Sequence, residues 1–366
     1  MTNIQPEPAP TRRSARARHI AALVAVALIA ASCGGSQSSA ATSSRNRLVS
    51  VGAGLRGLAG LEAAVYTHGL PRVAALALDA HGRMWAATAD YTDKGRDGVF
   101  VVAKPGARPV KVVAGLHTPL GLVWYHESLY VASAGLVETF SDFDGVKFAT
   151  RRTILTFASG TGQNNGIVLA PDGRMRVGIS APCDHCAPAS KWAASVVSFL
   201  PDGSDLRVDA TGIRAPVGLA YYPNASDLFV TMNQRDDLGA RTPGDWLAVV
   251  RQGQAWGFPA CYGQGGAACA GAPQPTAVLD EHAAVSGVAI VTGQLGPAVG
   301  TSALVAEWAK GKVQRVALEK TGSTYTGSVA PFLTGMKSPV PVLLGASGAL
   351  LVGDWATGTV YSISRK

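Results

Sequence analysis

Short apolar runs separated by turns recur along the chain at a regular interval. Each recurrence has an apolar triplet that usually opens on a small residue, then a turn, then a second short apolar run. Runs this short, bounded by turn residues, are typical of β-strands, and helical periodicity is not sustained over any comparable stretch. The six triplets are Ala75-Leu76-Ala77, Gly121-Leu122-Val123, Gly166-Ile167-Val168, Gly218-Leu219-Ala220, Gly287-Val288-Ala289 and Pro341-Val342-Leu343.

The interval between triplets predicts the size of each unit. Successive triplets open 46, 45, 52, 69 and 54 residues apart, which suits four short strands per unit with loop insertions in the longer intervals. Six four-stranded sheets packed around one axis form a six-bladed β-propeller. We therefore predict a single all-β domain of this kind over residues 47–366, in preference to a pair of β-sandwiches. Leu48–Val51 is the candidate strand for completing the last blade.

The first 46 residues do not follow this pattern. Four arginines precede the uninterrupted apolar run Ile20–Ala31, and Cys33 follows it after small residues. A run of this length is too short to span a bilayer, and the small residues fit a cleavage site. We predict a lipoprotein-type signal peptide over residues 1–32, lipidation of Cys33, and a flexible tether over residues 33–46. The protein is then expected to be exported and anchored to a membrane of the cell envelope.

Composition and charge narrow the class of protein. The chain is 47% hydrophobic and 15% charged, which excludes a disordered protein. Its net charge of +8 suggests an acidic partner at first, but removing residues 1–32 takes away four arginines and one glutamate and lowers the charge to +5. No other block of lysine and arginine is present, so we expect no nucleic-acid partner.

Four cysteines remain besides the predicted lipidation site Cys33. In an exported protein such cysteines are more often disulfide-bonded than reduced. We expect one disulfide between Cys183 and Cys186 and another between Cys261 and Cys269. The alternative is a zinc site formed by Cys183, His185 and Cys186, but no second ligand pair follows at a suitable spacing.

The longest interval between triplets carries the most distinctive segments. Residues 212–220, 233–237 and 254–262 follow one another in an order that resembles the glucose/sorbosone dehydrogenase family. The resemblance is strongest over residues 160–262, and the paired cysteines resemble the sorbosone dehydrogenase branch. It implies a six-bladed propeller that uses pyrroloquinoline quinone (PQQ) and calcium to oxidise a sugar.

The resemblance implies three cofactor contacts. Arg214 stands where the family has an arginine that binds the carboxylates of the quinone, and a guanidinium fork suits such a polyanion. Asn233 and Lys310 also match cofactor-binding positions. Ala215 replaces a family asparagine, so one polar contact to the quinone is missing.

The same resemblance implies a calcium site in the loop after the fourth triplet. Gln234, Arg235 and Asp236 match a stretch whose main-chain carbonyls hold the ion, and Asp236 and Asp237 can add carboxylate oxygens. The alternative is a polar loop in which the aspartates cap turns or pair with Arg235 and Arg241.

The catalytic base of the family is absent. Its histidine falls at Gly162 or Gln163 in this chain, and an amide cannot accept a proton at ordinary pH. The catalytic residue is therefore unassigned. The substitutes that the sequence offers are His117, His185, His282 and Asp184.

These observations predict an exported quinoprotein-type sugar dehydrogenase, acting on an aldose, sorbosone or a related alcohol or aldehyde, whose catalysis is lost or altered. If it is active, electrons pass to an external acceptor. The alternative is a non-catalytic propeller at the cell envelope that binds a carbohydrate or protein partner. A calcium-dependent lactonase on a similar fold is disfavoured, because acidic residues converging from several blades are not evident.

Overall fold

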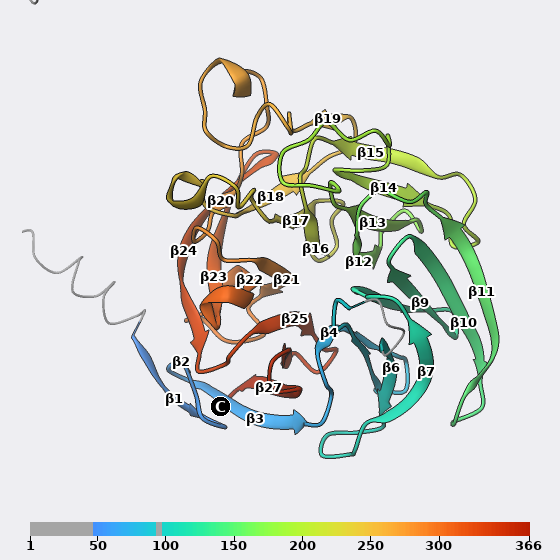
Figure 1. Ribbon diagram of the computed structural model, residues 1–366. Helices are drawn as coiled ribbons and strands as arrows, with labels where there is room; N and C mark the ends of the chain where they lie inside the picture. The colour runs from blue at the N-terminus through green and yellow to red at the C-terminus, as the bar shows by residue number, and fades with distance from the viewer. Residues whose placement is uncertain (1–46, 93–96) are drawn as a thin grey trace, which may run out of the picture.

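The structure is a computed structural model that describes residues 47–92 and 97–366. Six sheets surround one axis, which Figure 1 views end on. The predicted signal peptide, the lipidation site Cys33 and the tether over residues 33–46 lie outside the described residues.

The first three sheets follow the chain in order. The first contains β4 (Val73–Leu78), β5 (Met84–Thr88), β6 (Asp97–Val102) and β7 (Val110–Leu116). The second contains β8 (Gly121–Tyr125), β9 (Ser128–Ser133), β10 (Leu136–Phe143) and β11 (Phe148–Thr156). The third contains β12 (Asn164–Leu169), β13 (Met175–Ile179), β14 (Ser195–Phe199), β15 (Arg207–Thr211) and β19 (Gln254–Ala255).

Of the remaining three sheets, the fifth and the sixth combine strands from both ends of the described chain. The fourth contains β16 (Pro216–Tyr221), β17 (Leu228–Met232), β18 (Trp246–Val250) and β20 (Ala277–Val278). The fifth contains β21 (Val285–Thr292), β22 (Thr301–Glu307), β23 (Lys312–Thr321), β24 (Thr324–Thr334), β2 (Leu55–Leu58) and β1 (Leu48–Gly52). The sixth contains β25 (Pro339–Leu344), β26 (Leu350–Asp354), β27 (Thr359–Arg365) and β3 (Leu61–Thr67).

The described helices are short. They are the 3-10 helices η1 (Gly239–Arg241), η2 (Ala267–Cys269) and η3 (Trp308–Lys310). Within residues 47–92 and 97–366, no helix has the length and apolar character needed to cross a membrane.

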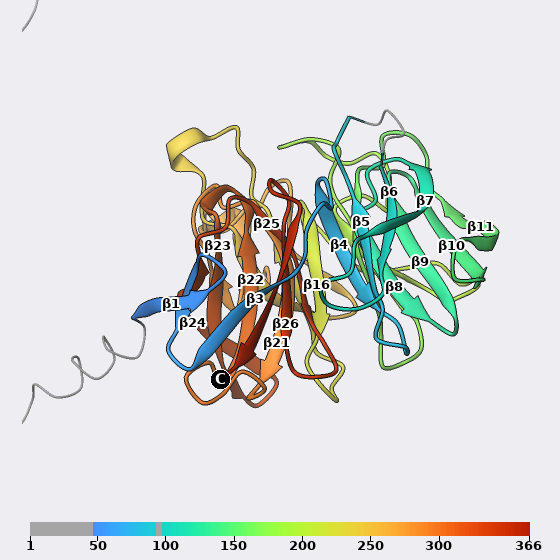
Figure 2. The same ribbon diagram turned by 90° about the horizontal axis from the view of Figure 1, so that it is seen from below.

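The six predicted triplets all lie on inner strands. These strands are β4, β8, β12, β16, β21 and β25; each contacts the next, and β25 contacts β4 to close the ring. Figure 2 shows β4, β16, β21 and β25 near one another in the side view. The prediction of an all-β, six-bladed propeller is confirmed, and the β-sandwich alternative is excluded.

Glycine at the start of a triplet lets neighbouring inner strands approach closely. A Cβ atom on Gly121 would lie 2.6 Å from the carbonyl oxygen of Asn165 in the next blade, and one on Gly218 would lie 2.3 Å from that of Ser286. Real Cβ atoms do not approach carbonyl oxygens this closely, so a larger residue would push the strands apart. The small residue that opens the repeat is therefore a packing requirement of the ring.

The last blade closes differently from the sequence prediction. Leu48–Val51 falls in β1, which pairs with β2 at the outer edge of the fifth sheet. The outer strand of the sixth sheet is β3, which pairs antiparallel with β27. Since β3 directly precedes the inner strand β4, it makes the same step from outer strand to next inner strand that β7 makes to β8. Proximity to β4 therefore selects β3 as the closing strand.

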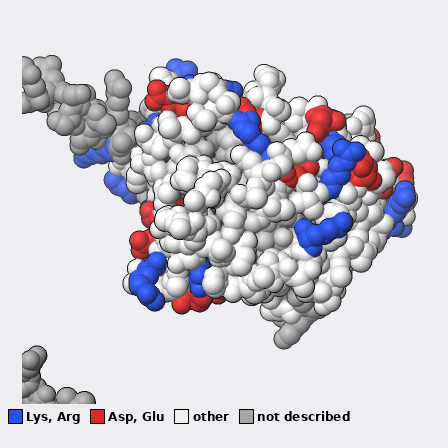
Figure 3. Space-filling model, turned by 90° about the horizontal axis from the view of Figure 1, so that it is seen from above, with Lys and Arg blue, Asp and Glu red and all other residues white. Residues whose placement is uncertain are grey.

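Apolar side chains fill the space between neighbouring blades. Trp85 of the first blade is fully buried and stacks on Trp124 of the second, with 4.9 Å between ring centroids. On the side that Figure 3 shows, acidic and basic residues are scattered over a largely uncharged surface. Apolar packing between the blades thus holds the ring together, and a site can form where the inner strands meet at the axis.

Candidate functional site

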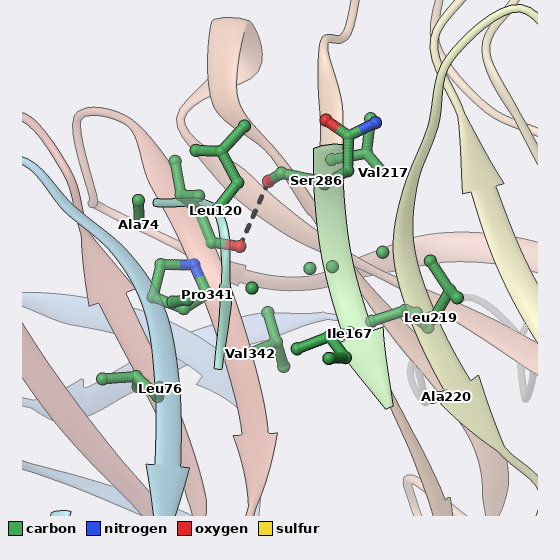
Figure 4. A pocket seen from close by; sticks show the side chains of 18 of the residues that line it. Ala74, Leu76, Leu120, Ile167, Val217, Leu219, Ala220, Ser286, Pro341 and Val342 are labelled. Carbon is green, nitrogen blue, oxygen red and sulfur yellow. Dashed lines mark hydrogen bonds between the residues drawn. The ribbon is translucent and has the colours of Figure 1, made fainter. Parts of the chain in front are cut away.

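A pocket of about 700 Å³ lies on the axis of the propeller, and all six inner strands contribute to its wall. Figure 4 shows the apolar side chains of Leu76, Ile167, Leu219 and Val342 around it. Its volume falls in the range of small-molecule sites, which are concave and mostly apolar. This pocket is the candidate ligand site of the chain.

The wall of the central pocket is uncharged. Among the described residues that line it, none is Lys, Arg, His, Asp or Glu. Its polar groups are mainly amides and hydroxyls, several of them fixed by the fold. The Asn165 amide donates to Ser180 Oγ and to the Pro216 carbonyl oxygen, each at 2.8 Å. Ser286 Oγ donates to the Val340 carbonyl oxygen at 3.1 Å (Figure 4).

Several polar and aromatic lining residues come from one face of the ring, where inner strands begin and second strands end, whereas Tyr221 lies at the opposite end of its inner strand β16. Gln163 directly precedes the inner strand β12, and Asn233 directly follows the second strand β17. Trp308 and Trp355 follow β22 and β26 in the same way, and Tyr91 lies just beyond β5. Loops of several blades thus bring together residues far apart in sequence.

Three aromatic side chains form a cluster in the pocket wall. The ring of Trp355 lies 5.9 Å from that of Trp308 and 6.3 Å from that of Tyr91. Trp308 is 39% exposed and Tyr91 is 57% exposed, so both present ring surface to solvent. Trp355 is held in place because its indole nitrogen donates to the Ala89 carbonyl oxygen at 2.8 Å and the Arg72 guanidinium lies 4.0 Å over its ring. We call these three residues the aromatic cluster.

The structure distinguishes the two positions at which the family histidine falls. Gly162 has φ +116°, and a Cβ there would lie 1.9 Å from the Ser180 carbonyl oxygen, so no side chain fits. Gln163 lines the pocket, and its amide donates to the carbonyl oxygens of Asn164 at 2.7 Å and Thr118 at 3.3 Å. The position facing the pocket is therefore Gln163, which cannot act as a base.

Arg214 does not line the central pocket. Its Nη1 donates to the carbonyl oxygens of Gln234 at 2.7 Å and Asn233 at 3.2 Å, and its Nη2 pairs with the Asp184 carboxylate. Arg214 lines a separate cavity of about 200 Å³ beneath the insertion after β18. Asn233, by contrast, is one of the residues that line the central pocket, and its side-chain oxygen is buried without a hydrogen-bond partner.

The residues predicted to hold calcium are bonded to other protein groups. Arg235 Nε and Nη2 donate to the two carboxylate oxygens of Asp237, each at 2.6 Å, which holds the pKa of Asp237 below its ordinary value. Thr242 Oγ1 donates to the Arg235 carbonyl oxygen at 3.0 Å. Asp236 pairs with His282 at 2.8 Å. The pairing of Asp237 with Arg235 is the alternative that the sequence left open.

Both ring nitrogens of His282 face acceptors in this loop. Its Nδ1 lies 2.8 Å from an Asp236 carboxylate oxygen and its Nε2 lies 2.8 Å from the Gly239 carbonyl oxygen. Because both partners are acceptors, both ring nitrogens must carry protons for both bonds to form. The bonds to Asp236 and Gly239 raise the pKa of His282 above its ordinary value of 6.5.

A buried carboxylate fixes the start of the loop. Asp245 is 2% exposed and accepts hydrogen bonds from the backbone N–H of Gln234 at 2.8 Å and of Val285 at 3.1 Å. Burial raises the pKa of Asp245 above its ordinary value. This carboxylate ties the loop to the inner strand β21.

Both expected disulfides, Cys183–Cys186 and Cys261–Cys269, are present. The thiolates that the zinc alternative requires are therefore oxidised. His185 Nε2 instead lies 3.1 Å from the Pro259 carbonyl oxygen, and Asp184 pairs with Arg214. None of the proposed substitute bases, His117, His185, His282 and Asp184, is among the residues that line the central pocket.

Lys310, the third predicted cofactor contact, is exposed at the end of η3 and lies outside the lining residues. Sequence reasoning missed its neighbour Trp308 and the equivalent Trp355. A signal for both was present: each tryptophan follows an acidic residue at the end of a second strand, as Glu307-Trp308 and Asp354-Trp355.

The described residues do not fit a quinone with calcium. A quinone with several carboxylates requires cations in the pocket wall, and none of the described lining residues is charged. A calcium ion requires six or more oxygen ligands, whereas no group of three or more His, Cys, Asp or Glu converges within residues 47–92 and 97–366. The carbonyl oxygens of Asn233 and Gln234 already accept from Arg214. We therefore derive no reaction step through either group.

Fold and site together define a six-bladed propeller whose central pocket has no charged side chain among the described residues. The fold is similar to the PQQ-bound aldose sugar dehydrogenase from Streptomyces coelicolor, with a TM-score of 0.68 and 18% identity over 85% of this chain and 100% of that one. The soluble aldose sugar dehydrogenase from Escherichia coli gives 0.66 and 18%, over 84% and 100%. The PQQ domain of pyranose dehydrogenase from Coprinopsis cinerea gives 0.70 and 16%, over 85% and 97%.

The sequence itself matches no family model and no curated protein. At these identities the likeness is one of fold. The chain has the propeller architecture found in these sugar dehydrogenases.

Proposed function

We propose that this protein binds a neutral carbohydrate or a related polyol in its central pocket and that it does not carry out quinone-dependent oxidation. The observation that carries the proposal is the uncharged wall of a ligand-sized pocket in a fold shared with sugar dehydrogenases. A neutral wall favours an uncharged ligand, because an anionic or cationic ligand would lose its hydration without gaining an ion partner.

The chemistry of the wall supports a polyhydroxy ligand in particular. The side-chain amides of Gln163 and Asn233 line the pocket and can exchange hydrogen bonds with ligand hydroxyls. The aromatic cluster offers exposed ring faces against which the C–H faces of a sugar ring can pack. A sugar ring has polar edges and apolar faces, so it matches both the amide groups and the aromatic rings of the pocket wall.

The test is a calorimetric titration of the purified protein with matched ligand pairs. We expect saturable binding of neutral aldoses, ketoses or polyols, and binding at least tenfold weaker for the matching sugar acids and sugar phosphates. Equal or tighter binding of the charged partner would contradict the proposal. So would the absence of binding by every neutral sugar in the panel.

A second candidate function is quinone-dependent sugar oxidation. The observation that favours it is the similarity in fold to a dehydrogenase solved in its PQQ-bound form. Its test is to add pyrroloquinoline quinone and calcium to the protein and to measure reduction of a dye across the same sugar panel. Dye reduction by the wild-type protein would establish this function in place of simple binding.

The substitution Gln163→His separates a decayed enzyme from a binding module. It restores a base at the position that faces the pocket, whereas Gly162 has no room for a side chain. Dye reduction gained only by Gln163→His would indicate that catalysis was lost through this residue. No activity in either protein, together with sugar binding, would support the binding function.

We also propose that the protein is exported and anchored to a membrane through Cys33. The apolar run before Cys33 and the two disulfides support this, because disulfides persist in oxidising compartments. The test is metabolic labelling with a fatty acid followed by membrane fractionation. Cys33→Ala should abolish both labelling and membrane retention, and equal labelling of the variant would refute the proposal.

A further inference from the structure

Three oxygen atoms surround the guanidinium of Arg214. Two are the main-chain carbonyl oxygens of Asn233 and Gln234, and the third belongs to the Asp184 carboxylate. Carbonyl and carboxylate oxygens are the ligands that a hard cation such as calcium also prefers. In this chain a side-chain cation occupies that position.

Separate elements hold the oxygen atoms of Asp184 and Gln234 in place. Asp184 lies inside the four-residue loop closed by the Cys183–Cys186 disulfide. Gln234 is fixed at its N–H by the buried carboxylate of Asp245, and its side-chain amide donates to the Tyr262 carbonyl oxygen. These acceptor oxygens are therefore held in place by other bonds and do not depend on Arg214 for their position.

The guanidinium is itself largely removed from water. Its side chain is 18% exposed, compared with 40% for Asp184. Burying this charge is favourable only because oxygen acceptors surround it. The planar fork matches them well, since Nη1 reaches both carbonyl oxygens while Nη2 reaches the carboxylate.

We propose that Arg214 is a built-in cation that takes the place of a metal ion between the 183–186 loop and the 233–237 loop. It thereby positions Asn233 in the wall of the central pocket without calcium. A divalent cation at the same carbonyl oxygens would be repelled by the guanidinium and would have to displace it. This inference concerns metal dependence and does not rest on the proposed carbohydrate binding.

The test compares melting temperatures in excess calcium and in a chelator. For the wild-type protein we expect the two melting temperatures to agree within about 1 °C, because the cation position is already filled. Arg214→Met removes the cation and should lower the melting temperature by roughly 5–10 °C in the chelator. Calcium at about 100 times its dissociation constant should then restore roughly 5 °C to this variant, since the carbonyl oxygens and Asp184 are free to bind it.

Two controls accompany Arg214→Met. Arg241→Met removes an equal charge from the exposed end of η1 in the same region and should be insensitive to calcium. Arg214→Lys keeps a cation with fewer donors, so it should be less stable than the wild type and yet insensitive to calcium.

Three results would overturn the proposal. One is stoichiometric calcium binding by the wild-type protein in a calorimetric titration. Another is a calcium response of Arg214→Lys equal to that of Arg214→Met. The third is a folded Arg214→Met protein that gains no stability from calcium. If Arg214→Met does not fold, the titration of the wild type and the response of Arg214→Lys still decide the question.

Discussion

The central pocket and the loops beside it use opposite chemistry. The pocket wall is built from inner strands and strand ends and, among the described residues, carries no charged side chain. The neighbouring loops contain the ion pairs Arg214–Asp184, Arg235–Asp237 and His282–Asp236. Charges with which a cofactor could be bound are thus present near the pocket, but they are bonded to one another.

This difference shows that, on one face of the propeller, the residues that contact a ligand can differ from the residues that hold the loops in place. Ion pairs in the loops fix the backbone that surrounds the pocket, while amides, hydroxyls and aromatic rings remain to contact a ligand. Four changes test whether the two regions are as independent as their chemistry indicates.

The largest effect is expected at the close contact between inner strands. Gly218→Val places a side chain where even a Cβ would lie 2.3 Å from the Ser286 carbonyl oxygen. We expect a loss of at least about 3 kcal/mol in the free energy of unfolding, because the ring must open to admit it. Chemical denaturation measures this loss. Gly345→Ala, whose Cβ would lie 3.3 Å from the nearest atom, is the control, and equal losses in the two variants would contradict the packing argument.

The next effect concerns the disulfide that holds Asp184. Replacing Cys183 and Cys186 by serine opens a four-residue loop, and the loop-entropy model gives a cost of about 2 kcal/mol in the free energy of unfolding. Opening the longer Cys261–Cys269 loop should cost slightly more, about 2.6 kcal/mol. Arg214 keeps its bonds to the carbonyl oxygens of Asn233 and Gln234 when the Asp184 loop is opened, so ligand affinity of the 183–186 variant should stay within about twofold. A larger loss of affinity would show that the two regions are coupled.

A smaller effect is expected from the aromatic cluster. Trp355→Ala removes the ring that contacts both Trp308 and Tyr91, and it should weaken binding of a neutral sugar roughly tenfold. Trp355→Phe keeps an aromatic face and should retain most of the affinity. Val146→Ala changes an exposed apolar residue in the β10–β11 turn and should have no effect. Calorimetric titration distinguishes the three variants, and equal affinities would exclude the cluster from the binding site.

The smallest effect is the pH dependence of His282. Its pKa is raised in the folded state, so its contribution to stability is fully present below pH 6.5 and is lost as the pH rises through the raised pKa. The side chain is partly exposed, and solvent screening keeps the contribution small. An NMR titration of the imidazole should show a midpoint above 6.5. His282→Gln should remove the corresponding pH dependence of the melting temperature, and an unchanged profile would assign that dependence to other groups.

Local pattern was sufficient to predict the blades and the disulfides. The glycine that opens four of the six triplets reflects the close approach of inner strands, so the sequence repeats where this packing repeats. Cysteines four and nine residues apart, counted inclusively, leave few choices of partner. Pattern was insufficient for the closing strand, because Leu48–Val51 and β3 are both apolar and only their position relative to β4 distinguishes them.

The candidate site was less predictable from sequence. The resemblance to sugar dehydrogenases drew attention to Arg214 and the 233–237 loop, and the structure brings them into direct contact. The resemblance could not show that these groups bond to one another instead of facing the pocket, because that depends on the direction of each side chain. The aromatic cluster was missed because its members are 47 to 264 residues apart in the chain.

The sequence by itself determined an all-β chain of six repeated units, since strand pattern and turn spacing are local properties. The tertiary structure alone decided which strand closes the ring, that no described residue of the pocket wall is charged, and that Arg214 bonds to the carbonyl oxygens of Asn233 and Gln234. The physical reason is that convergence at an axis depends on where six separate strands place their ends. Charge pairing depends in turn on which acceptors those ends bring within hydrogen-bond distance.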